Sequence, residues 1–99
     1  MGRVDWMDRY WTAVYEIFDL PVLMSKRDFL YSYVDDERQE IDWLRLREMV
    51  RPWSHGEQVL VRIANCLYNE GEHVGIDELQ VLSPETRRVV LNIIDRCYG

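Results

Sequence analysis

Two histidines and two cysteines are the residues of this chain that most often hold metal ions or act as nucleophiles. His55 and His73 stand on opposite sides of a long apolar segment, and neither belongs to a Cys-x-x-Cys or His-x-x-x-His pair. Cys66 and Cys97 fall on apolar faces, which is typical of buried, reduced thiols in a cytosolic protein. We therefore expect no structural zinc site, no other metal and no cofactor.

The acidic segment 69–79 has some features of a calcium-binding loop. If Gly75 is the sixth position of such a loop, Val74 and Val81 occupy positions five and twelve, where the loop needs an oxygen ligand and a bidentate acid. Because valine supplies neither, we expect no calcium site. His73 lies among the acids of this segment and could contact a metal ion loosely, although a solvated surface loop explains it more simply.

No arrangement typical of an enzyme accompanies these residues. The chain has no nucleophile elbow, no glycine-rich phosphate loop and no His-Glu-x-x-His motif. Ser54 precedes His55, but it also stands three residues before Glu57, which is the spacing of a helix capping box. A cap explains Ser54 better than a catalytic role does, so we predict a protein without enzymatic activity and without catalytic residues.

The elements that carry these residues are predicted to be helices. Residues 5–19 place their apolar side chains in an arc of about 200° at helical periodicity. Residues 55–69 and 84–97 show apolar stripes of the same period, the last one through Val89, Val90, Ile93, Ile94 and Cys97. Shorter helices are expected at 26–34, 43–51 and 77–82.

The predicted helix starts carry residues typical of N-caps. These caps are Ser25, Asp42, Ser54, Asp77 and Ser83. Gly71 is expected to end the 55–69 helix in a left-handed conformation. No linker rich in glycine, serine or proline divides the 99 residues. We therefore predict an all-α fold, a compact bundle of four to five helices in a single domain spanning residues 1–99.

The apolar arc of residues 5–19 is wider than one packing contact requires. Either other helices enclose this segment, or part of the arc meets a partner, and a homodimer is the commonest way to cover such a face. Trp11 and Tyr15 lie towards the edge of the arc. We therefore expect their side chains to be exposed and to serve as binding anchors, since Trp and Tyr are enriched at binding hot spots.

Charge limits the classes of partner. The chain has 12 basic and 18 acidic residues, for a net charge of −6, which makes a general binder of nucleic acid or anionic membranes improbable. No apolar stretch approaches the ~20 residues that span a bilayer, and the N-terminus has no apolar signal core. We expect a cytoplasmic protein that does not bind membranes.

The charge is distributed unevenly. Residues 43–68 are mildly basic, with Arg45, Arg47 and Arg51 close together, while both flanking regions are acidic. Solvation or pairing with nearby acids would explain these charges. The alternative is an acidic surface that engages a basic partner. The partner-binding residues predicted on this basis, together with the two aromatic residues, are Trp11, Tyr15, Asp35, Asp36, Glu37 and Glu40.

A resemblance to known proteins lies in the second half of the chain. The residues that carry it are Trp53-Ser54-His55-Gly56-Glu57, Leu60, Ala64, Leu67-Tyr68-Asn69 and Leu82-Ser83. In this pattern, residues 40–99 resemble small uncharacterised helical proteins of Gram-positive bacteria and their phages. The resemblance implies a phage or mobile-element context, in which proteins of this size often bind and inhibit or adapt a larger host protein.

Two functions therefore stand as expectations. The first is a protein-interaction module whose acidic surface binds a basic protein, such as a nucleic-acid-binding host or defence factor. The second is a small DNA-binding regulator of helix-turn-helix type, formed by the helices at 55–69, 77–82 and 84–97, with Arg87 and Arg88 placed to meet phosphates. Acidic residues surround these two arginines, so the first expectation is preferred.

Overall fold

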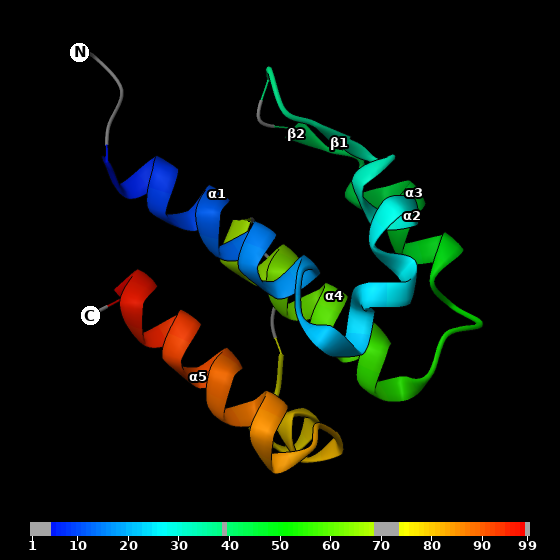
Figure 1. Ribbon diagram of the computed structural model, residues 1–99, viewed down its shortest axis with the longest axis vertical. Coiled ribbons are helices and arrows are strands. Elements are labelled where there is room, and N and C mark those ends of the chain that lie inside the picture. The colour runs from blue at the N-terminus through cyan, green and yellow to red at the C-terminus, as the bar shows by residue number, and fades with distance from the viewer. Residues whose placement is uncertain (1–4, 39, 69–73, 99) are drawn as a thin grey trace.

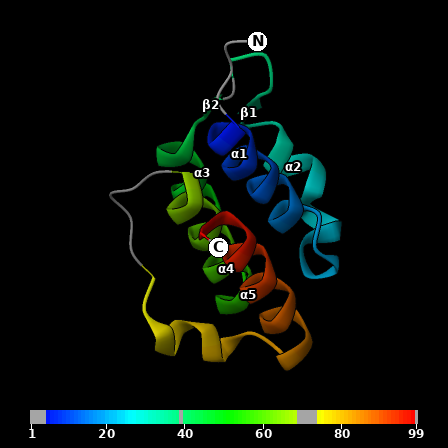
Figure 2. The same ribbon diagram turned by 90° about the vertical axis from the view of Figure 1, so that its left-hand side faces the viewer.

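The computed structural model describes residues 5–38, 40–68 and 74–98. Within these ranges the predicted all-α fold is confirmed, with five α-helices, two 3₁₀ helices and one small β-hairpin around a hydrophobic core (Figures 1 and 2). The elements are α1 (Asp5–Phe18), η1 (Pro21–Lys26), α2 (Arg27–Tyr31), β1 (Val34–Asp35), β2 (Glu40–Ile41), α3 (Trp43–Met49), α4 (His55–Tyr68), η2 (Ile76–Val81) and α5 (Pro84–Tyr98).

The three long helices form the body of the fold. Helix α1 packs against both α4 and α5, and these two helices run in the opposite direction to α1 (Figure 1). Among the side chains that the structure describes, helix α4 contributes the most buried ones, from Val59 to Leu67. An ion pair of 3.0 Å between Arg96 Nη2 and Glu16 Oε1 links α5 to α1 at the surface.

An aromatic cluster joins α1 to the shorter elements. The Phe18 ring is fully buried and forms an edge-to-face pair with Tyr31 from α2, at 5.8 Å between ring centroids. It also lies 6.2 Å from the ring of Trp43 at the start of α3. Tilted and edge-to-face ring pairs at these distances are favourable beyond the area they bury. Phe18 therefore connects α1 to both α2 and α3.

Three of the predicted caps are present. The Asp42 carboxylate accepts a hydrogen bond from the Arg45 backbone N–H at 3.2 Å, and Ser83 Oγ accepts one from Thr86 at 3.3 Å. Ser54 and Glu57 form a complete capping box, with bonds of 3.3 and 3.0 Å. The Lys26 ammonium, 2.9 Å from the Glu57 carboxylate, and the Ser54 bonds hold the Glu57 pKa below its usual value. This box fixes the start of α4.

Other local predictions were wrong. Ser25 lies inside η1, where no side chain caps the following helix, and α2 is shorter than expected. At η2 the N-cap is Gly75, whose N–H donates to the Glu78 carboxylate at 3.0 Å, rather than Asp77. Val89 is 44% exposed because α5 is covered on one side only. The predicted cap at Gly71 lies outside the described residues.

None of the helices in the described ranges is both long enough and apolar enough to cross a lipid bilayer.

Candidate functional site

The predicted acidic connection folds as a short β-hairpin. Strands β1 and β2 pair antiparallel, with Val34 opposite Ile41 and Asp35 opposite Glu40. The side chain of Ile41 is buried in the core, and Val34 packs against that core, so this end of the hairpin is anchored. The other end projects away from the helices in both views of the chain (Figures 1 and 2).

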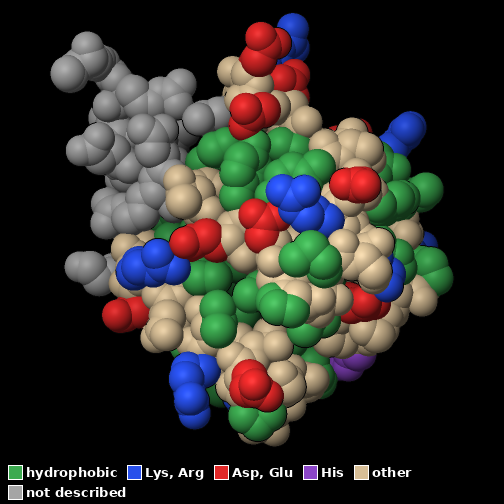
Figure 3. All heavy atoms as spheres, viewed as in Figure 1, with side chains coloured by type: hydrophobic (Ala, Val, Ile, Leu, Met, Phe, Trp, Pro, Cys, Tyr) green, Lys and Arg blue, Asp and Glu red, His purple; other side chains and the backbone are tan. Residues whose placement is uncertain are grey.

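The carboxylates of the hairpin gather at its projecting end. Asp35, Asp36, Glu37 and Glu40 are all exposed, and Figure 3 shows acidic side chains with one basic group at this tip. The basic group of the segment is Arg38, whose guanidinium lies 3.8 Å from the Asp35 carboxylate. The structure therefore brings the four predicted acids together on one projection.

Tyr15 connects this projection to α1. Its hydroxyl donates a hydrogen bond to the Asp36 carboxylate, and its ring is half-buried. Burial, and then the hydrogen bond to Asp36, raise the pKa of Tyr15 to about 12. Two of the predicted binding residues, Tyr15 and Asp36, are thus in direct contact, although they are far apart in the sequence.

Trp11 corrects the prediction for α1. Its side chain is only 6% exposed, and its ring lies 5.2 Å from Tyr15 and 5.6 Å from Tyr68 of α4. The expectation that Trp11 is exposed was therefore wrong. From Trp11 to Phe18 the wide apolar arc is enclosed by other elements of the same chain. The homodimer stays a prediction. Its argument from an exposed apolar arc does not apply to this part of α1, because the arc is buried there.

Replacing Tyr15 by phenylalanine tests the link between α1 and the hairpin. An unfolded tyrosine ionises near pH 10, so the hydrogen bond stabilises the fold fully below that pH and is lost as the pH rises towards 12. We expect Tyr15→Phe to lower the melting temperature by about 4 °C at pH 8, and the difference from the wild type to shrink at pH 11. Circular dichroism melts at both pH values measure this. A difference that is the same at both would contradict the link.

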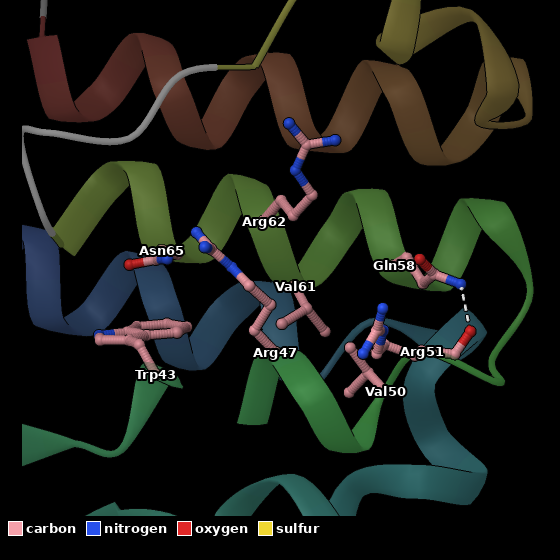
Figure 4. A pocket seen from close by; sticks show the side chains of 8 residues that line it. All are labelled: Trp43, Arg47, Val50, Arg51, Gln58, Val61, Arg62 and Asn65. Carbon is pink, nitrogen blue, oxygen red and sulfur yellow. Dashed lines mark hydrogen bonds between the residues drawn. The ribbon is translucent and has the colours of Figure 1, made fainter. Parts of the chain in front are cut away.

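A pocket between α3 and α4 is the site that the sequence analysis missed. It has a volume of about 100 Å³ and is lined, among the described residues, by Trp43, Arg47, Val50, Arg51, Gln58, Val61, Arg62 and Asn65 (Figure 4). The cluster of arginines in residues 43–68 was the available signal. Periodicity does not show, however, that α3 and α4 pack so as to leave a hollow beside these side chains.

Hydrogen bonds fix one end of this pocket. The Gln58 side-chain amide donates to the backbone carbonyls of Arg51 and Trp53, at 2.9 and 2.8 Å (Figure 4 draws the first). At the other end, the indole N–H of Trp43 is buried and has no hydrogen-bond partner among the residues that the structure describes. The Asn65 side chain, on α4, is 6% exposed. The pocket is therefore lined by polar side chains together with the apolar side chains of Val50 and Val61.

The residues considered for metal binding are dispersed. His55 is exposed at the first position of α4, and His73 lies outside the described residues. Cys97 is buried and Cys66 is partly buried. Within the described ranges, no three His, Cys, Asp or Glu side chains come together as a metal site would require.

Comparison with protein-family models, with curated proteins and with solved structures gave no match to this chain.

Proposed function

We propose that this protein is a small interaction module without enzymatic activity, which binds a larger basic protein in the cytoplasm and inhibits or adapts it. The observation that carries the proposal is the projecting β-hairpin with its four exposed carboxylates. Residues 35–40 contain these four acids and one arginine, so the projection carries a net charge of −3.

The hairpin suits electrostatic recognition for two physical reasons. Its carboxylates are already in water, so they attract a basic partner over about one Debye length, ~8 Å at physiological salt, and need not be fully desolvated on contact. In addition, the buried side chain of Ile41 and the Tyr15–Asp36 hydrogen bond fix the position of the hairpin relative to α1 and the core. A surface held in place before binding loses less conformational entropy when the complex forms.

The class of partner rests on charge and on resemblance. A negative projection complements a basic surface, and nucleic-acid-binding proteins carry such surfaces. If residues 40–99 belong, as the sequence suggests, with small uncharacterised helical proteins of Gram-positive bacteria and their phages, a host or defence factor is the target that we propose.

A double charge reversal tests the hairpin. Glu37→Lys with Glu40→Lys changes two exposed acids and leaves the Asp35 and Asp36 contacts in place. The matched control, Glu48→Lys with Asp95→Lys, makes the same change in net charge at exposed positions on α3 and α5. Proteins captured from a bacterial lysate by the wild type are identified by mass spectrometry, and the affinity of each captured protein for all three versions is then measured.

We expect the hairpin variant to bind the captured protein at least about tenfold more weakly, since like charges facing each other at an interface cost several kcal/mol. The control variant is expected to bind as the wild type does. If the wild type, the hairpin variant and the control variant bind the captured protein equally well, the hairpin is not the binding site. Salt-sensitive binding of duplex DNA by the wild type would favour the DNA-binding regulator instead.

A further inference from the structure

Two tyrosine–aspartate pairs lie side by side where α1 meets α2 and the hairpin. The Tyr15 hydroxyl donates a hydrogen bond to the Asp36 carboxylate, and the Tyr31 hydroxyl donates one to Asp19 at 3.1 Å. The rings of Tyr15 and Tyr31 meet edge to face, at 5.3 Å between centroids. Both tyrosines are half-buried, and both carboxylates are exposed. These four residues are called the tyrosine–aspartate surface below.

Arg27 shows which kind of group one of these pairs binds. Its Nε atom lies 2.7 Å from Asp19 Oδ1, the same oxygen that accepts the Tyr31 hydroxyl. Its guanidinium carbon lies over the Tyr31 ring, 4.9 Å from the ring centroid. A guanidinium suits this position because it is planar, always charged and weakly hydrated, so it stacks on a ring while it donates to a carboxylate. On this surface, a carboxylate that is bonded to a tyrosine therefore still accepts an arginine.

The other pair has the same two kinds of side chain and no arginine from this chain. Within the described ranges the Asp36 carboxylate forms no ion pair, and the nearby Arg38 pairs with Asp35 instead. Figure 3 shows hydrophobic side chains directly below the acidic tip of the hairpin, followed by basic groups between acidic ones. The Asp36 pair therefore stands beside the most negative part of the hairpin.

We propose that the tyrosine–aspartate surface binds arginine side chains of the basic partner in preference to lysine side chains. An arginine of the partner pairs with Asp36 beside the Tyr15 ring. This contact repeats the one that Arg27 makes with the other pair, and the neighbouring acids of the hairpin attract the rest of a basic segment. The inference rests on the proposed function, because it names the side chain that the hairpin region takes from its partner.

Calorimetric titration of the full chain with two synthetic peptides, hexa-arginine and hexa-lysine, tests the proposal at physiological salt. The two peptides carry the same charge, so general attraction to an acidic surface would bind both equally. Stacking on an exposed aromatic ring favours the guanidinium. We therefore expect hexa-arginine to bind at least about threefold more tightly than hexa-lysine.

Removing Arg27 separates specific binding from general attraction. Arg27→Gln leaves Asp19 and Tyr31 available to the peptide, so we expect this variant to bind hexa-arginine about threefold more tightly than the wild type does. Arg88→Gln makes the same charge change at an exposed position on α5, on the other side of α1 from the hairpin (Figure 1). This control is expected to change the affinity less than about twofold, because salt screens exposed charges that are far apart.

Asp36→Asn tests the other pair. The asparagine side-chain oxygen still accepts the Tyr15 hydroxyl, while the negative charge that an arginine pairs with is removed. We expect this variant to bind hexa-arginine about threefold more weakly and to lose most of the preference over hexa-lysine. Asp95→Asn, the same change at an exposed position on α5, is expected to keep the preference. Circular dichroism checks that each variant remains folded.

Three results would overturn the inference. The first is hexa-arginine binding no more tightly than hexa-lysine, which includes the absence of binding by both. The second is the same response from Arg27→Gln and Arg88→Gln, and the third is an unchanged preference in Asp36→Asn.

The proposed function fails or stands by a separate result. If the captured protein binds the hairpin charge-reversal variant more weakly while the two peptides bind equally, the hairpin is a binding site without arginine recognition. If the peptides and their variants behave as expected while the captured protein is insensitive to the charge reversal, arginine recognition stands and the proposed role of the hairpin is wrong.

Discussion

Replacing Trp11 by glutamate is expected to unfold the protein. The Trp11 side chain is 6% exposed and contacts aromatic rings of α1 and α4. Removing a buried aromatic side chain costs about 3–5 kcal/mol, and burying a carboxylate among apolar groups adds to that loss. Domains of this size have about 5–15 kcal/mol of stability in total. Loss of helical circular dichroism at 25 °C would measure the effect.

The adjacent residue provides the control for this variant. Thr12 is exposed on the same helix, so Thr12→Glu introduces the same charge without burying it, and we expect it to fold normally. A folded Trp11→Glu variant with unchanged melting would place Trp11 at a surface. Light scattering of that variant and of the wild type would then show whether Trp11 holds a homodimer together.

Replacing Phe18 by alanine is expected to produce the second largest loss of stability. Phe18 is fully buried where α1 meets Tyr31 of α2 and Trp43 of α3. Truncating such a ring costs about 3–5 kcal/mol. In a domain of about 100 residues this corresponds to a fall in melting temperature of at least roughly 12 °C. Urea unfolding followed by circular dichroism gives the free-energy difference directly.

Phe29 serves as the matched residue for this test. It is half-buried in α2, with its ring 5.4 Å from Tyr33 and 5.5 Å from Trp53. We expect Phe29→Ala to cost less than half as much as Phe18→Ala, because its ring leaves a smaller buried cavity. Equal losses in the two variants would show that Phe18 is not the residue that joins α1 to the shorter helices.

The long helices could be predicted from the sequence because their signals are local. Apolar periodicity and the Ser54–Glu57 capping box lie within a few residues of one another, and the structure has the box where it was expected. The position of Trp11 could not be predicted in this way. Periodicity assigns a residue to a face of its helix, but one of the two rings beside Trp11 belongs to Tyr68, which is distant in the sequence.

The candidate site was predicted in part for the same reason. The acids of residues 35–40 are adjacent in the sequence, so their common location was foreseeable, but strands of two residues are too short to show an alternating pattern. The hydrogen bond between Tyr15 and Asp36 depends on how α1 lies beside the hairpin, and the pocket depends on how α3 packs against α4. Such packing leaves no local signal in the residues that form it.

The pairing of α1 with α4 and α5 has a consequence for synthesis on the ribosome. Helix α1 ends at Phe18, whereas α4, the first of its two long partners, ends at Tyr68. At translation rates of ~5–20 residues per second, roughly 3–10 s separate these two points. During that interval the nascent chain carries the apolar face of α1 without its covering helices. During this interval α1 presents the kind of transiently exposed apolar surface that chaperones bind, before it becomes part of a core.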